Sequence, residues 1–157
     1  MQMSLNKYTT LESAYPVIVE KLEKGGTVTF MPNGTSMLPM LRNGMDIVVL
    51  KKPEGKLKKY DLPFYRRNNG SFVLHRIVAV KSDGSYVLCG DNQYKMEEGI
   101  TDDQIFAVVS AFNRKGKSYT VKSLSYRVYV RFWCYSRPFR RAFAGVKWRA
   151  KRLFNKS

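Results

Sequence analysis

Ser36 and His75 are the two side chains of this sequence whose types could together perform nucleophilic chemistry. Ser36 lies in the stretch GTSMLPMLRNG, and His75 is the only histidine of the chain. A serine hydroxyl becomes a nucleophile when a base within hydrogen-bond reach takes its proton, and imidazole is the commonest such base. The spacing leaves two interpretations open. The two residues are either a catalytic pair, or a polar turn residue and a strand histidine whose hydrogen bonds are satisfied by other groups.

The residues around Ser36 would present its side chain on a firm turn. A β-type run, TVTF, leads into MPNG, and Ser36 follows the glycine of that turn. Met37 is suited to anchor the turn in a hydrophobic core, and Pro39 restricts the backbone that leaves it. We therefore expect Ser36 at an exposed corner with a buried neighbour.

The segment that carries both residues, 27–112, has the pattern of a β domain. Short runs of β-branched and aromatic residues alternate with Gly, Pro, Asn and Asp clusters. The stretch SFVLHRIVAVKSDGSYVLCG predicts a hairpin that turns at residues 82–84. Many short strands without helices between them predict a mainly β, antiparallel body.

The first segment, residues 1–26, predicts a short helix. Apolar residues recur at helical spacing from Thr9 to Lys24, and Thr9 with Glu12 forms a capping-box pattern. Pro16 conflicts with so early a start and favours one near Ser13. We expect neither a signal peptide nor a membrane-spanning helix, because the apolar runs are too short.

The last segment, residues 113–157, carries most of the charge. The net charge is +16, and residues 104–157 hold 14 Lys and Arg with no Asp or Glu. YRVYVRFWCY favours a helix, and Phe139 to Phe154 predicts a basic amphipathic helix. Such a helix suits peripheral binding to an anionic membrane, or packing of its apolar stripe on the β body. Nucleic acid ranks lower, since no separate reading module accompanies the charge.

Cysteine usage gives no sign of a metal site. Cys89 and Cys134 lie far from any Cys-x-x-Cys or Cys/His cluster, so we expect two reduced thiols and no structural zinc. The sequence carries no indication of an oligomeric state.

Three boxes occur in order: Gly34-Thr35-Ser36-Met37-Leu38-Pro39, then VLHRI at residues 73–77, then Gly90-Asp91-Asn92. Together they resemble the S24/S26 peptidase superfamily, which includes signal peptidase I and the self-cleaving repressors. Within this superfamily, the VLHRI box with its histidine resembles the corresponding box of the archaeal, endoplasmic-reticulum and sporulation-type signal peptidases. The resemblance covers roughly residues 27–112 and implies a barrel-like β fold.

The resemblance also implies roles for individual residues. Ser36 would be the nucleophile and His75 the general base, with Asp91 orienting the imidazole. Glu97 or Glu98 would be the alternative acid, and the interpretation of Asp91 as a turn residue stays open. Gly34 occupies a position where the lysine-dependent relatives have a hydroxyl, so the oxyanion would rely on the N–H of Ser36, helped by the hydroxyl of Thr35.

By this resemblance the chain is a membrane-associated serine endopeptidase that needs no cofactor. Its substrate would be a leader or signal peptide with small residues before the cut, bound as an added strand. Two alternatives stay open: a self-cleaving or partner-binding repressor-like module, and an inactive basic adaptor for membrane or nucleic acid. The side of the membrane is not indicated.

Overall fold

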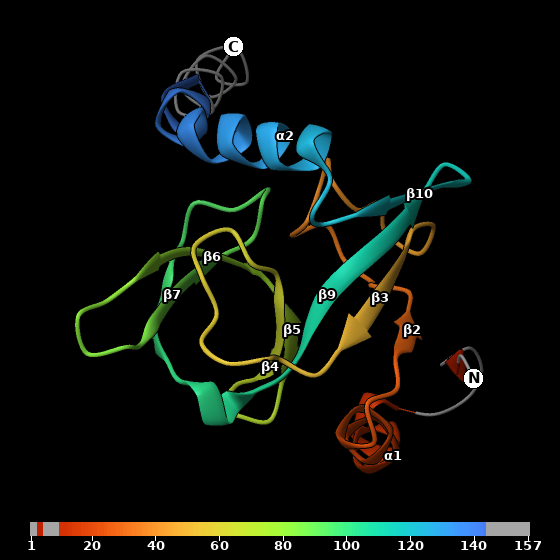
Figure 1. Ribbon diagram of the computed structural model, residues 1–157. Coiled ribbons are helices and arrows are strands. Elements are labelled where there is room, and N and C mark those ends of the chain that lie inside the picture. The colour runs from red at the N-terminus through yellow and green to blue at the C-terminus, as the bar shows by residue number, and fades with distance from the viewer. Residues whose placement is uncertain (1–2, 5–9, 144–157) are drawn as a thin grey trace, which may run out of the picture.

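The computed structural model describes residues 3–4 and 10–143, and its architecture is mainly antiparallel β (Figure 1). A seven-stranded sheet curves into a half-barrel, and a three-stranded sheet lies against its open side. Helix α1, Leu11–Glu23, packs at one end, and helix α2, Leu124–Tyr135, crosses the other. The expected β body with an N-terminal and a C-terminal helix is confirmed.

The large sheet is organised by its longest strand, β9. Its order is β1-β2-β3-β9-β4-β5, with β10 pairing on β9 as well. Only the β1–β2 pair is parallel among the described strands. The strands are β1 (Met3–Ser4), β2 (Val28–Phe30), β3 (Ile47–Lys51), β4 (Pro63–Arg66), β5 (Phe72–Leu74), β9 (Ile105–Arg114) and β10 (Lys117–Thr120).

The small sheet contains β6 (Arg76–Val80), β7 (Tyr86–Cys89) and β8 (Glu97–Ile100), in that order. β6 and β7 form the predicted hairpin, in which Lys81 and Ser85 close the turn with a backbone hydrogen bond. A short 3-10 helix, η1 (Asp102–Gln104), then leads from β8 into β9.

The run that was expected to form the first strand of this hairpin is broken at His75. β5 pairs with β4 of the large sheet, whereas β6 pairs with β7 of the small sheet. A chain segment that passes from one sheet to a differently oriented one must leave the hydrogen-bonded pairing of the first before it joins the second. His75 therefore marks the point at which the chain crosses from one sheet to the other.

Helix α1 begins earlier than the alternative near Ser13 predicts. Thr10 is the N-cap, and its hydroxyl accepts the Ser13 N–H at 3.5 Å. Pro16 lies inside the helix on its exposed face, where the Glu12 carbonyl that lacks its usual donor remains near solvent. The predicted late start is therefore wrong. Thr9, the expected first residue, lies outside the described residues.

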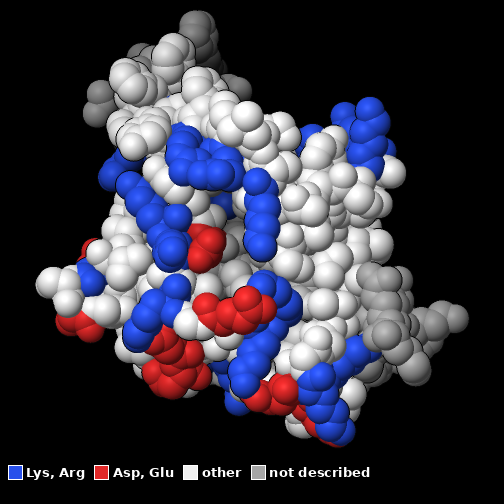
Figure 2. All heavy atoms as spheres, in the orientation of Figure 1, with Lys and Arg blue, Asp and Glu red and all other residues white. Residues whose placement is uncertain are grey.

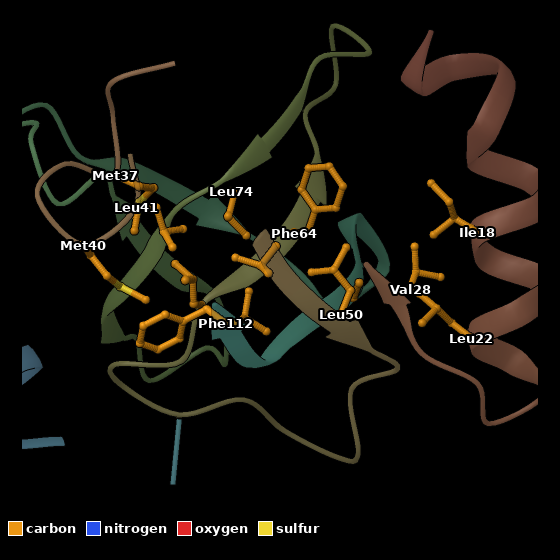
Figure 3. Close-up of a cluster of buried hydrophobic side chains, with 14 of the residues drawn as sticks. Ile18, Leu22, Val28, Met37, Met40, Leu41, Leu50, Phe64, Leu74 and Phe112 are labelled. Carbon is orange, nitrogen blue, oxygen red and sulfur yellow. The ribbon is translucent and has the colours of Figure 1, made fainter. Parts of the chain in front are cut away.

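Two hydrophobic clusters form the core. The larger joins α1 to the half-barrel through Ile18, Leu22 and Val28, and it extends to Met37 and Leu41 on the far side of the sheet (Figure 3). The smaller fills the space between the sheets with residues that include Tyr65, Ile77, Tyr86, Leu88 and Ile105.

The C-terminal segment is partly sheet and partly helix. β9 and β10 carry the sheet past residue 112, into the segment that was expected to be tail. α2 buries Tyr126 and Val130 against the core, and residues 137–143 form a further helical piece. The rest of the helix expected as far as Phe154 lies outside the described residues. None of the helices within residues 10–143 has the length and apolarity to cross a bilayer.

Candidate active site

Ser36 lies on a turn that is fixed to the core by its own neighbours. Met37, Met40 and Leu41 are buried, so the turn has three apolar anchors directly after the serine. Gly34 adopts a φ of 103°, which favours glycine, and its N–H donates to the Asn43 side chain at 2.7 Å. The Ser36 side chain is consequently presented at a half-buried corner.

The Gly90-Asp91-Asn92 loop holds this turn from the other side. The Asn92 N–H donates to the Ser36 carbonyl at 2.8 Å, and the Asn92 side chain donates to the Thr35 carbonyl at 3.2 Å. A Cβ on Gly90 would lie 2.7 Å from the Ser36 carbonyl oxygen, closer than real Cβ contacts allow. Glycine is thus required at position 90 for the close approach of the two loops.

His75 is buried at the crossing between the sheets, and Glu97 contacts it from β8. Glu97 Oε1 lies 3.0 Å from His75 Nδ1. An ionised carboxylate only accepts hydrogen bonds, so the proton of the neutral imidazole belongs on Nδ1. This tautomer leaves the lone pair of Nε2 available as a base.

Glu97 is itself held by the large sheet. Arg67, which follows β4, donates through Nε to Glu97 Oε2 at 2.7 Å and through Nη2 to Oε1. The Tyr65 hydroxyl lies 3.4 Å from His75 Nδ1. The imidazole, the carboxylate and the guanidinium therefore form a continuous chain of polar contacts across the two sheets.

Burial and charge set the protonation of this group. Burial lowers the pKa of His75 below its usual 6.5, and the Glu97 charge opposes that shift only in part. Burial would raise the pKa of Glu97, but hydrogen bonds from Arg67 and Tyr65 and the Arg67 charge lower it overall. At neutral pH the pair is thus an uncharged imidazole and a carboxylate, the state that general-base chemistry requires.

Asp91, the acid expected to orient His75, occupies a different position. Both of its oxygens accept from the buried Arg76 guanidinium, Oδ1 at 2.8 Å and Oδ2 at 2.7 Å. Arg76 also donates to the Tyr60 carbonyl and the Tyr126 hydroxyl. The carboxylate in contact with His75 is that of Glu97, and Asp91 joins the Gly90-Asp91-Asn92 loop to β6.

The other two site residues expected from the sequence lie away from the imidazole. Glu98 is exposed and pairs with Lys81 at 2.6 Å, because consecutive strand residues point to opposite faces. Thr35 is exposed and does not line the cleft beside Ser36, whereas its neighbour Gly34 does.

Ser36 and His75 open into one cleft of about 750 Å³. The residues that line it include Arg67 and Gln93 beside these two, and an apolar set formed by Leu11, Ala14, Val17, Phe30, Phe64 and Phe72. Among the described residues no hydrogen bond joins the serine to the imidazole. Such contacts in unliganded enzymes are often long and tighten only when substrate binds.

β5 gives this cleft a strand edge. It is the last strand in the order of the large sheet, and Phe72, Val73 and Leu74 all line the cleft. An edge strand presents backbone groups that an extended peptide can pair with. Because β5 ends directly before His75, a peptide added there would run past the imidazole.

No metal centre accompanies these residues in the described part of the chain, where no three His, Cys, Asp or Glu side chains gather closely enough to hold an ion. Cys89 and Cys134 are free thiols. Burial raises the pKa of both thiols, as is typical of structural cysteines.

Arg67, Tyr65 and Gln93 are the residues of the site that the sequence did not single out. Arg67 lies in the run YRRNNG, where a basic residue before a turn is ordinary. Its role depends on a pairing with Glu97 across 30 residues of chain, for which the sequence gives no local signal. A scan against protein-family models and a search of curated proteins both find no match to this chain.

Proposed function

We propose that the chain is a serine endopeptidase of signal-peptidase type, with Ser36 as nucleophile, His75 as general base and Glu97 as the acid that orients it. The observation that carries the proposal is the 3.0 Å contact of Glu97 with His75 Nδ1, in a cleft that also contains Ser36. A nucleophile, a base and an orienting group are the three components that activated serines need.

The reaction would proceed through an acyl-enzyme. His75 Nε2 takes the Ser36 proton as Oγ bonds to the scissile carbonyl carbon, and the same proton passes to the amine as the C–N bond breaks. A water molecule then attacks the ester carbon while Nε2 again accepts a proton, and that proton passes to Ser36 Oγ as the Oγ–C bond breaks and the acid product leaves. The backbone N–H of Ser36 would donate to the oxyanion at each tetrahedral stage.

The cleft supports an extended, apolar substrate. A peptide paired with the β5 edge would lay alternate side chains on the wall formed by α1 and by Phe30 and Phe72. A leader or signal peptide combines an extended cleavage region with apolar residues, as this wall requires. Small residues directly before the cut would follow from the resemblance of the Ser36 and His75 boxes.

Incubation with a peptide library, read by mass spectrometry, tests the proposal. The library contains apolar segments followed by pairs of small residues, and the Ser36→Ala variant is the control. We expect cleavage in trans that the variant lacks. Cleavage that persists in the Ser36→Ala variant would refute the assignment of the nucleophile, and self-cleavage alone would favour the repressor-like alternative.

A further inference from the structure

The outer face of α2 is apolar and faces solvent. Leu124, Val128, Phe132 and Tyr135 are 74%, 59%, 69% and 69% exposed. Their spacing of four, four and three residues puts them on one side of the helix, opposite the side that buries Tyr126 and Val130. A soluble surface rarely carries a row of large apolar side chains, so this face indicates a binding surface.

Two more exposed apolar side chains follow α2. Phe139 and Phe143, in the helical residues 137–143, are 74% and 79% exposed. They are again four residues apart, so they lie on one side of that helical piece. We call these two residues and the four of α2 the apolar row.

Exposed Lys and Arg side chains accompany the apolar row, and this part of the sequence contains no Asp or Glu. Lys122, Arg127, Arg131 and Arg141 are exposed, and the chain has no Asp or Glu after position 103. In Figure 2 white side chains cover the end of the molecule where α2 lies, and Lys and Arg side chains cluster directly beside them. An apolar row with a cationic border is the composition of helices that lie in the interface of anionic membranes.

A cavity of about 1010 Å³ adjoins this face, between the C-terminal end of α2 and the small sheet. Its wall is largely apolar and its border is basic; the lining includes Lys59, Val87, Tyr94, Met96, Arg137 and Arg141. Arg137 is only 7% exposed, and within the described residues its Nε and Nη2 atoms have no hydrogen-bond partner. A buried guanidinium with two unsatisfied nitrogens is costly, and its planar donors match the oxygens of a phosphate.

We propose that the apolar row and this cavity form a docking surface for an anionic lipid bilayer, in which Arg137 receives a lipid phosphate. The apolar row enters the boundary between headgroups and acyl chains, and the cationic border meets the negative surface. This surface is separate from the Ser36 cleft, so the inference does not depend on the proposed peptidase activity.

Charge favours a bilayer over the other partners. A second copy docked on the same face would bring its own Arg127 and Arg131 against these cations, and like charges at an interface are repulsive. Nucleic acid would match the cations, but Leu124 and Val128 offer it neither stacking planes nor hydrogen bonds. Anionic lipid is complementary to both the charge and the apolar row.

Vesicle flotation of the full chain tests the docking surface. We expect the protein to float with vesicles of phosphatidylcholine and phosphatidylglycerol, and to remain at the bottom with phosphatidylcholine alone or in high salt. The double variant Phe132→Ser with Phe139→Ser should bind at least about tenfold more weakly, because both apolar side chains leave the interface. Both residues are exposed, so the fold should tolerate the change.

Two control variants keep this result specific. Met45→Ser removes a side chain that is 67% exposed but lies in the loop before β3, and Lys24→Gln removes an exposed charge at the C-cap of α1. Both should float like the unchanged protein, as should Ser36→Ala. Undiminished flotation of the Phe132 and Phe139 double variant would overturn the proposal, as would equal flotation with neutral vesicles.

A lipid titration of the unchanged protein tests whether Arg137 binds the lipid phosphate. Short-chain phosphatidylglycerol is titrated into the ¹⁵N-labelled protein, and the Arg137 Nε–H resonance should move while short-chain phosphatidylcholine at equal concentration has a smaller effect. Arg137→Met should weaken flotation on the order of fivefold, the effect of one cation at a membrane surface. An Arg137 resonance that ignores both lipids would refute its role as the phosphate ligand.

Discussion

Glu97 Oε1 lies 3.0 Å from His75 Nδ1, although the two residues are 22 positions apart, with Glu97 in β8 and His75 at the crossing between the sheets. The contact fixes the imidazole from the side opposite the nitrogen that would serve as base. It also identifies the carboxylate to be tested first.

Replacing Glu97 by Gln should lower kcat by about 10²- to 10⁴-fold, the range ascribed to a positioned acid–base group, with a smaller effect on KM. The amide can present a donor to Nδ1 and so favour the wrong tautomer. Glu98→Gln is the matched control, because its side chain is exposed and pairs with Lys81. Equal losses in the two variants would contradict the assignment of Glu97.

The single histidine makes the protonation of the site directly measurable. An NMR titration of the His75 imidazole should give a pKa below 6.5, since burial outweighs the Glu97 charge. In Glu97→Gln the pKa should fall further, because the charge that favours imidazolium is removed. Glu98→Gln should leave it unchanged, and a His75 pKa above 6.5 in the unchanged protein would contradict the burial that the structure shows.

The same shift predicts how stability responds to acid. The unfolded chain binds a proton at His75 near pH 6.5, whereas the folded chain does so only at lower pH. The unfolded state therefore holds more protons between these two values, and the His75 contribution to stability is lost as pH falls through that window. Urea unfolding between pH 7.5 and 5.5 checks this, with His75→Gln as the variant that should lose the dependence on this group.

Asp91 should matter for stability more than for chemistry. Asp91→Asn leaves the buried Arg76 charge without its partner and should cost about 3–5 kcal/mol in the free energy of unfolding. Glu54→Gln, which breaks an exposed pair with Lys51, should cost at most about 1 kcal/mol. Chemical denaturation measures both, and similar small losses would contradict a structural role for the Arg76 pair.

Gly90→Ala should disturb Ser36 through its backbone. The new Cβ would lie 2.7 Å from the Ser36 carbonyl, so the serine turn must shift, and peptidase activity should fall at least about tenfold with a small misplacement of the nucleophile. Gly84→Ala is the control: its φ of 83° makes alanine unfavourable by about 1–2 kcal/mol, but the hairpin turn around it is open. That variant should lose stability and keep activity.

Much of the fold follows from local patterns in the sequence. The β-rich body, the β6–β7 hairpin and the helical character of α2 all rest on short-range signals, namely periodicity and turn residues. The start of α1 was predicted wrongly from Pro16. This proline lies on the exposed face of the helix, where it destabilises the helix less than it would in a buried position. Met37 is buried in the core, as expected for an apolar residue directly after a turn.

The acid of the site could not be chosen from the sequence, because it depends on non-local register. β8 pairs with β7 so that Glu97 lies opposite Leu88, with a register shift between Tyr86 and Leu88. A different register by one residue would have turned Glu98 toward the imidazole instead. Asp91 was the natural candidate by its position in the chain, and only the buried Arg76 explains why it points elsewhere.

The crossing at His75 has a consequence for folding. Arg67 follows β4 of the large sheet, whereas Glu97 belongs to β8 of the small sheet. A chain in which only one of the two sheets has formed would lack the Glu97 contact that orients the imidazole. Orientation of the imidazole therefore requires both sheets to be in place at the same time.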